Sequence, residues 1–263
     1  PIFASVPPIM NEQGNKKLSK RDGAKDILAY REEGYLPDAM LNFLASLGWN
    51  DGTEQEVFTR DELIEKFSLK RVQKSGARFD EKRLLWLNGA HIRNIPVDRL
   101  YEYMSPWDDN PQKDGGHTGF WPKSAYAPNI TKEYRMKVLA LAQDRLKMFE
   151  DLRGFGYFFT EPEINLELID GNKQLKKLSD SERRELLETA RHELAKITDW
   201  TPESIQNCLN KLLETTGQKP GILFSLIRIA VTWAPFSPQL NDTLALIDRE
   251  HTLARLRNYL DIK

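Results

Sequence analysis

Residues 201–217 read TPESIQNCLNKLLETTG, a segment that specifies both ends of a helix. Thr201 can cap the first turn, Pro202 suits the first helical position, and Gly217 ends the run. Between these ends, apolar side chains recur at helical spacing and form one face that must be buried. The members of this face are Ile205, Cys208, Leu209, Leu212 and Leu213.

The segments on either side show the same helical pattern. Residues 221–233 are apolar on nearly every side, which predicts a buried helix. No strong alternation typical of strands is present, and the one candidate strand is Ile2–Val6. The sequence therefore predicts a mainly α protein. Further helices are predicted over 37–47, after the capping box that starts at Thr59, after Asp80, from Thr131 through Phe149, after Ser179 or Ser181, over 239–247 and over 249–260.

The composition of the chain excludes several classes of protein and of binding site. The 263 residues carry 38 basic and 39 acidic side chains, for a net charge of −1, so a uniformly basic nucleic-acid coat is excluded. The single cysteine, Cys208, excludes a disulfide framework and a cysteine-rich zinc site. We expect no metal site, because the acidic residues of the 105–130 segment lack a coherent ligand spacing. No apolar run is long enough to span a bilayer. We expect no signal peptide, no membrane attachment and a cytoplasmic location.

Residues 105–130 differ from the rest of the chain in being rich in Pro, Gly, Asp and Asn. This composition predicts a linker or an irregular loop. The aromatic residues in it, Trp107, Phe120, Trp121 and Tyr126, indicate that it packs against the protein. The chain is thus expected to have one domain over 1–104 and a second, helical domain over 131–263.

The sharpest local feature is the basic stretch GNKKLSKRDG at residues 14–23. Lysine supplies a mobile positive point charge that can bind the phosphates of a nucleoside triphosphate. The spacing of a Walker A loop is absent. On the residues alone, a short basic loop is more often a solvated surface than a phosphate clamp.

The stretch Lys17–Arg21 resembles the KMSKS-type signature of class I aminoacyl-tRNA synthetases, in the form found in bacterial glutamyl-tRNA synthetases. Several other blocks resemble that family in the same order, so the resemblance extends over nearly the whole chain. These blocks are 30–37 (YREEGYLP), 41–49 (LNFLASLGW), 79–89 (FDEKRLLWLNG), 235–240 (PFSPQL) and 250–256 (EHTLARL).

The resemblance implies a role for the loop in catalysis. It assigns Lys17, Ser19, Lys20 and Arg21 to the catalytic site, with Lys20 as the contact to ATP. ATP with Mg²⁺, glutamate and tRNA(Glu) are the implied cofactor, substrate and partner. The full enzyme would join glutamate to ATP as an adenylate and then pass it to the tRNA.

The family also needs a His-x-Gly-His signature on the half of the catalytic fold that precedes this loop. None of the four histidines, at 91, 117, 192 and 251, has a partner at that spacing. We therefore interpret the chain as the C-terminal half of such a ligase. We expect it to be a monomer, to hold no bound cofactor, to bind tRNA weakly and to be unable to form the adenylate alone.

Two regions are expected to face RNA. Residues 66–83 carry a net charge of +5 and, by the resemblance, belong to a domain that contacts the tRNA stem. The resemblance places the anticodon near Arg228 and the 237–240 turn, and it assigns the third anticodon base to Arg145. A snorkelling Arg228 paired with an acid, and a structural Arg145, are the alternatives. The anticodon-contact residues are therefore Arg228, Ser237, Pro238, Leu240 and Arg145.

Two other functions stay open at this point. One is a non-catalytic helical RNA-binding or adaptor protein derived from a synthetase. The other is a helical protein-interaction scaffold, which predicts no salt-dependent binding of tRNA. Whether the full enzyme would charge glutamine tRNAs as well as glutamate tRNAs is also open.

Overall fold

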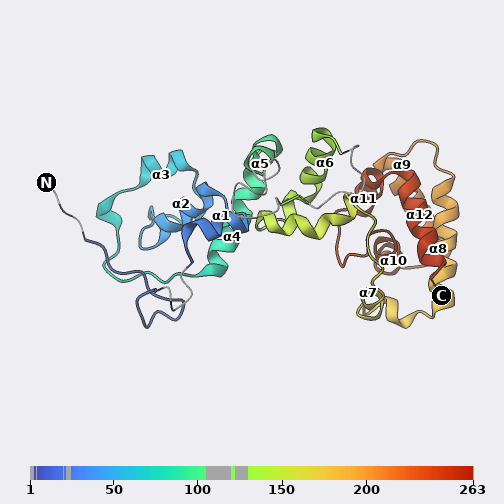
Figure 1. Cartoon of the computed structure of the whole chain (residues 1–263), viewed down its shortest axis with the longest axis horizontal. Coiled ribbons are helices and arrows are strands. Elements are labelled where there is room, and N and C mark those ends of the chain that lie inside the picture. The colour runs from blue at the N-terminus through green and yellow to red at the C-terminus, as the bar shows by residue number, and fades with distance from the viewer. Residues whose placement is uncertain are drawn as a thin grey trace. The chain divides into compact units, whose positions relative to one another are not determined.

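The computed structural model describes residues 3, 5–19, 21, 25–104, 120–121 and 130–262. The described chain is built from the α-helices α1–α12 and short 3₁₀ segments (Figure 1), which confirms the prediction of a mainly α protein. No β-strand occurs within those ranges. Met10 alone forms isolated bridges, antiparallel with Lys17 and parallel with Arg78. The candidate strand Ile2–Val6 lies partly outside the described residues.

The chain divides into two compact units. The first comprises Pro1–Trp121 together with Gln143–Arg153, and the second comprises Pro122–Ala142 together with Gly154–Lys263. The segment Gln143–Arg153, which lies within the helical domain expected over 131–263, thus belongs to the first unit.

The helices of the first unit begin where the sequence supplies caps. The Thr59 side chain accepts a hydrogen bond from Glu62 N and the Glu62 side chain accepts from Thr59 N, which confirms the capping box. Asp80 caps the next long helix as expected. Helix α2 packs on α3 and α4 around a core that includes Met40, Phe43, Leu84 and Leu87. The helices are α1 (Ile27–Glu33), α2 (Pro37–Ser46), α3 (Arg60–Lys66), α4 (Glu81–Asn94) and α5 (Val97–Met104), with a 3₁₀ turn, η2, at Leu69–Arg71.

The helix expected from Thr131 through Phe149 is wrong beyond Ala142. Helix α6 (Lys132–Ala142) is followed by two 3₁₀ segments, η4 (Gln143–Arg145) and η5 (Phe149–Phe158). Hydrogen bonds to α4 and its C-terminus explain the break. Gln143 Nε2 donates to Ile92 O at 2.7 Å and to Ile95 O at 2.6 Å. Tertiary contacts have therefore overridden a helical periodicity.

Amide side chains also fix backbone segments from within the first unit. Asn88, which is fully buried, accepts from Leu36 N at 2.8 Å and donates to Lys147 O at 2.6 Å. Asn42 Oδ1 accepts from Phe58 N at 2.9 Å and lies 3.0 Å from Nε2 of the buried His91. Buried amides of this kind join chain segments that local sequence does not bring together.

The second unit contains the helices that carry the clearest sequence signals. Ser179, Thr201 and Gly217 occupy the cap positions predicted for them. The expected burial of the apolar helix is confirmed, because most residues of α10 are buried. The helices of the second unit are α6, α7 (Glu167–Asp170), α8 (Asp180–Ala195), α9 (Pro202–Thr216), α10 (Pro220–Thr232), α11 (Leu240–Ile247) and α12 (Arg249–Leu260), with a 3₁₀ turn, η6, at Leu175–Lys177.

A buried arginine connects three parts of the second unit. Arg255 on α12 is only 2 % exposed. Its guanidinium donates to Val231 O near the end of α10 at 3.2 Å, to Tyr157 O and Thr160 O at 3.0 Å, and to the Glu161 carboxylate at 3.0 Å. The charge thus satisfies carbonyl groups at a helix C-terminus, where a cation is favourable.

The expected packing of the 105–130 aromatics is confirmed for the two that are described. Phe120 and Trp121 are buried, with ring centroids 5.3 Å from Phe149 and 5.8 Å from Tyr101. Trp107 and Tyr126 lie outside the described residues. Within the described part of the chain, no helix has both the length and the apolar character that crossing a bilayer requires.

Replacing Asn88 by alanine should destabilise the first unit. The substitution leaves Leu36 N and Lys147 O without their partners, at a cost of about 1–3 kcal/mol for each orphaned group. The free energy of unfolding from urea titration measures the effect. Asn94→Ala, at an exposed position of the same helix, should change it by less than about 0.5 kcal/mol. Equal losses in the two variants would contradict the role given to Asn88.

The first unit should lose stability as pH falls below about 6.5. Burial lowers the pKa of His91, an effect partly opposed by the charge of Asp38. The unfolded chain therefore binds the proton at a higher pH than the folded chain, and protonation favours unfolding. The thermal midpoint should fall less between pH 7.5 and 5.5 in His91→Gln than in the unmodified protein. His192→Gln, at an exposed position, should show the full decrease.

Candidate nucleotide and RNA sites

The basic loop begins on a short hairpin-like base formed by residues 9–18. Leu18 N donates to Ile9 O at 2.8 Å, and Asn11 N donates to Lys16 O at 2.9 Å. The buried Asn11 side chain accepts from the backbone N of Asn15 and of Lys16 at 3.2 and 3.3 Å. Met10 joins this base to the chain before α4, through bonds to Ala77 O and from Phe79 N. The start of the KLSKR stretch is therefore held in place.

Gly14 suits the backbone conformation at the tip of this turn. Its φ is +72°, and a Cβ at this position would lie 2.5 Å from Nε of Arg78. A side chain would therefore meet both an unfavourable backbone conformation and the Arg78 side chain. The absence of a side chain at Gly14 thus permits a tight turn that packs against Arg78.

The structure places three of the four residues assigned to the catalytic loop. Lys17, Ser19 and Arg21 have exposed side chains, and Lys20 lies outside the described residues. After the loop, Lys25 Nζ lies 2.9 Å from the Glu33 carboxylate on α1 and 3.8 Å from that of Glu81 on α4. The hydrogen bond with Glu33 raises the pKa of Lys25.

The basic stretch 66–83 is divided between paired and exposed charges. Lys66 lies 3.3 Å from the Asp51 carboxylate, Arg83 lies 3.4 Å from that of Glu56, and Arg71 donates to the Asp51 carbonyl. Three other lysines are exposed and, within the described ranges, have no acidic side chain at ion-pair distance. These are Lys70, Lys74 and Lys82.

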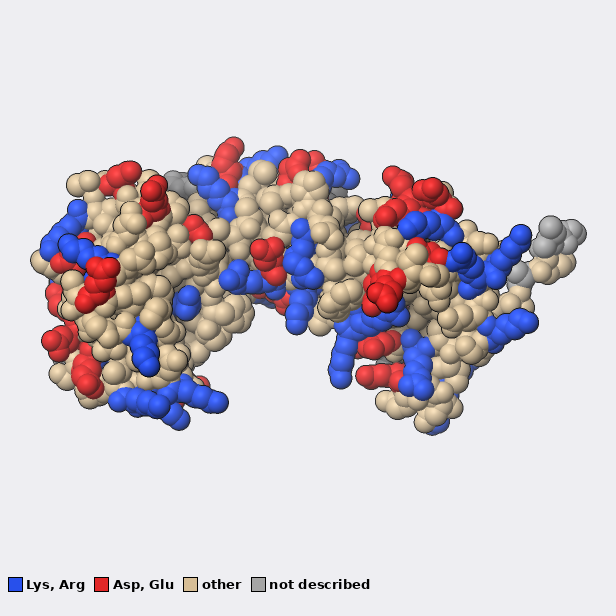
Figure 2. Space-filling model, turned by 180° about the vertical axis from the view of Figure 1, so that it is seen from behind, with Lys and Arg blue, Asp and Glu red and all other residues tan. Residues whose placement is uncertain are grey.

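Charges of both signs are interspersed on the face of each unit that Figure 2 shows. This mixture agrees with the net charge of −1. Neither unit presents a wholly basic face in this view.

Four of the five residues assigned to the anticodon lie in the second unit: Arg228 in the last two turns of α10, Ser237 and Pro238 in the turn that follows, and Leu240 at the start of α11. Arg228 is half-buried, and its Nε donates to Ser237 Oγ at 2.9 Å. Ser237 Oγ in turn donates to Pro238 O at 2.9 Å. Ser237, Pro238 and Leu240 are buried, whereas Phe236 is 52 % exposed. The Ser237 hydroxyl thus couples the arginine directly to the turn.

Trp233 sets the direction in which the chain leaves α10. Its φ is +45°, unusual for a residue with a side chain, and its ring stacks on Tyr259 at 5.7 Å between centroids. Trp233 N donates to Ile229 O at 2.8 Å. The stacked ring therefore holds a left-handed helix end that glycine usually forms.

Arg145 belongs to a different unit from the other anticodon candidates. It lies in η4, in the part of the chain that packs with the first unit, and its side chain is exposed. Arg255 is a residue that inspection of the sequence missed, because a charge on an amphipathic helix is normally assigned to the solvent face. The buried Asn11 was missed as well, since nothing in the local sequence marks it as the residue that shapes the loop.

Comparison with known proteins finds two family matches that together span most of the chain. Residues 99–260 match the family of the anticodon binding domain, and residues 2–86 match that of the catalytic domain of class I tRNA synthetases for Glu and Gln. The first match covers more than half of the chain. The second contains the basic loop and helices α1–α3.

Curated relatives show the same relationship over the whole chain. Glutamate–tRNA ligase 1 from Alkalilimnicola ehrlichii is 36% identical over 99% of this chain and 51% of its own length. The glutamate–tRNA ligase from Chloroflexus aurantiacus is 34% identical over 97% of this chain and 49% of its own length. The chain therefore spans about half the length of the curated relatives it matches.

Solved structures share the fold. The glutamate tRNA ligase from Elizabethkingia meningosepticum, crystallised in complex with its amino acid, matches 99% of this chain with a TM-score of 0.77 at 24% identity, over 51% of its own chain. The glutamate–tRNA synthetase from Elizabethkingia anophelis matches 100% of this chain with a TM-score of 0.75. Together with the family matches, these likenesses show that the chain belongs to the anticodon-binding domain family and corresponds to the C-terminal part of a glutamate–tRNA ligase, including the end of its class I catalytic domain.

Proposed function

We propose that this chain binds tRNA(Glu) for a glutamate–tRNA ligase, which attaches glutamate to the tRNA through an adenylate formed from ATP. The observation that carries the proposal is the hydrogen bond between Arg228 and Ser237, inside the stretch that matches the anticodon binding domain. It links a planar donor group, suited to recognising unstacked bases, to the turn that follows α10.

The basic loop would serve the nucleotide. Lys17, in the base fixed by Asn11, and Ser19 and Arg21 beyond it are exposed, and the loop lies within the stretch that matches the catalytic domain. Lysine and arginine at this position would stabilise charge that develops on the phosphates. We propose Lys20 as the ATP contact, and we expect no glutamate-dependent pyrophosphate exchange from the 263-residue chain alone.

RNA binding would combine two kinds of contact. Lys70, Lys74 and Lys82 are exposed and would bind phosphates of the tRNA stem, which position the RNA without reading its sequence. Arg228 and the 237–240 turn would read the anticodon. Arg145 would contact the third anticodon base from the segment that packs with the first unit.

The lysine assignment predicts a change in salt dependence. Replacing Lys70, Lys74 and Lys82 by alanine should weaken binding of a tRNA(Glu) transcript and reduce the slope of log K against log[salt] by up to about 1 for each phosphate that is no longer neutralised. Filter binding at several salt concentrations measures it. A control triple variant with the same charge change, Lys173, Lys176 and Lys177 to alanine, should keep the original slope. An equal reduction in both variants would contradict the assignment.

The arginine assignment predicts a loss of discrimination. Arg228→Ala should weaken binding of the tRNA(Glu) transcript by about 1–3 kcal/mol and should leave binding of a transcript with an altered anticodon nearly unchanged. Arg257→Ala, at a position 74% exposed in the same unit, is the matched control and should affect neither RNA. If Arg228→Ala weakens both transcripts equally, Arg228 does not read the anticodon.

A further inference from the structure

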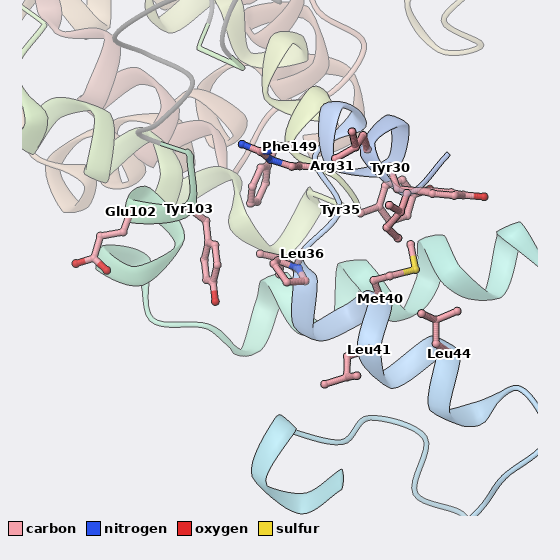
Figure 3. Close-up of a pocket in the computed structure, with 13 residues that line it drawn as sticks. Tyr30, Arg31, Tyr35, Leu36, Met40, Leu41, Leu44, Glu102, Tyr103 and Phe149 are labelled. Atoms are coloured by element: carbon pink, nitrogen blue, oxygen red, sulfur yellow. The ribbon is translucent and has the colours of Figure 1, made fainter. Parts of the chain in front are cut away.

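Both units expose large apolar side chains, but the exposed groups differ in chemistry. In the first unit, residues of α1, α2 and α5 line a hollow of about 570 Å³, where Leu41 and Leu44 extend from α2 and Tyr103 lies opposite (Figure 3). The large apolar side chains exposed in this hollow are all aliphatic. In the second unit, the turn after α10 exposes an aromatic ring, that of Phe236, which is 52% exposed. An aromatic ring can stack on a planar ligand, which an aliphatic side chain cannot do.

The turn between α10 and α11 exposes different side chains from those that the family resemblance assigns to the anticodon. The three assigned residues within 237–240 are buried. The exposed side chains of this turn are those of Pro235, Phe236 and Gln239. Phe236 supplies the one aromatic face among them. A base that approaches the turn therefore meets the Phe236 ring before it can reach a buried side chain.

The Phe236 ring is supported by the 3₁₀ segment η5. Its centroid lies 6.2 Å from that of Phe155, with an angle of 72° between the two planes, which is an edge-to-face contact. Phe155 itself is buried. A Cβ added to Gly154 would lie 3.8 Å from Cζ of Phe236, so the tip of the ring lies close to the η5 backbone. The ring is thus held in place although about half of the residue remains exposed.

Hydrogen bonds also fix the backbone on both sides of Phe236. Before it, Ala234 N donates to Oγ1 of Thr232 at 3.2 Å. After it, Ser237 Oγ accepts from Arg228 Nε and donates to Pro238 O, each at 2.9 Å. A ring that is fixed before a ligand arrives loses little conformational entropy on binding.

We propose that Phe236 stacks on an unstacked base of the bound RNA, an inference that rests on the proposed function and adds a residue to its anticodon-reading surface. Unstacked bases of RNA loops are commonly bound on aromatic side chains. Such stacking tolerates any sequence, because every base has a π-face. Phe236 would therefore supply affinity, and Arg228, which is bonded to the neighbouring Ser237, would supply discrimination.

A substitution series tests whether the aromatic ring is needed. Phe236→Leu keeps an apolar side chain without a π-face and should weaken binding of a tRNA(Glu) transcript roughly fivefold or more. Phe236→Tyr keeps the ring and should bind within about twofold of the unmodified chain. Phe3→Leu is the matched control, because Phe3 is an exposed phenylalanine of the first unit, and it should leave binding unchanged. Filter binding measures all four proteins.

Two readouts separate stacking from a merely structural role. Phe236→Leu should weaken binding of a transcript with an altered anticodon by the same factor, so that the ratio of the two affinities stays constant. It should also keep the slope of log K against log[salt], since the ring neutralises no phosphate. A lower affinity ratio would overturn the proposal, because it would show that the substitution acts by displacing Arg228. The proposal also fails if Phe236→Tyr binds as weakly as Phe236→Leu.

A short single-stranded RNA with the anticodon-loop sequence distinguishes the failure of this inference from that of the proposed function. If the chain prefers the tRNA(Glu) transcript and Phe236→Leu binds it equally well, the proposed function stands and Phe236 does not stack on the RNA. If the chain has no preference for that transcript but binds the short RNA in a way that Phe236→Leu weakens and Phe236→Tyr preserves, the stacking site stands and the proposed function does not. Absence of binding to either RNA would overturn both.

Discussion

The guanidinium of Arg255 is the interaction on which the second unit depends. It lies in the interior, and its hydrogen bonds reach the end of α10, the chain after η5 and the Glu161 carboxylate. An unpaired charge at such a position would cost several kcal/mol. The elements that supply its acceptors must therefore assemble together with α12. Arg228 lies just before Val231 on α10, and Ser237 lies in the turn after α10. By binding Val231 O, Arg255 therefore also holds the end of α10 from which the surface proposed to meet the anticodon begins.

The first unit is organised by neutral groups instead. Asn42, Asn88 and Gln143 bind backbone groups that are distant in sequence, whereas Asn11 binds those of Asn15 and Lys16 within the loop base. Hydrogen bonds of this kind have directional geometry, so each amide admits one arrangement of its partners. These bonds fix the ends of α2 and α4, while α1 and α2 leave apolar side chains exposed.

Helix ends that are capped by neighbouring residues could be predicted from the sequence. Helix ends and contacts that depend on residues far apart in the sequence could not. The caps at Thr59, Ser179 and Thr201 are formed by neighbours within one turn, and each begins a helix where expected. The helix after Thr131 was extended too far, because the groups that end it belong to α4. Helices α1 and α5 were missed, since each has eight residues or fewer and so offers only a short stretch in which a helical period can be recognised. Arg228 stood out as the one charge on an apolar helix, whereas nothing in the sequence distinguished Arg255 from a solvent-facing arginine.

Trp233 has a consequence for any attempt to redesign this protein. Glycine would adopt the left-handed backbone conformation of Trp233 with less strain, and it is the residue most often found at such helix ends. Yet the indole ring stacked on Tyr259 is what orients the chain as it enters the turn. A glycine chosen for backbone preference alone would remove the stacking contact, so the 237–240 turn would lose its fixed orientation although helix α10 itself stayed intact.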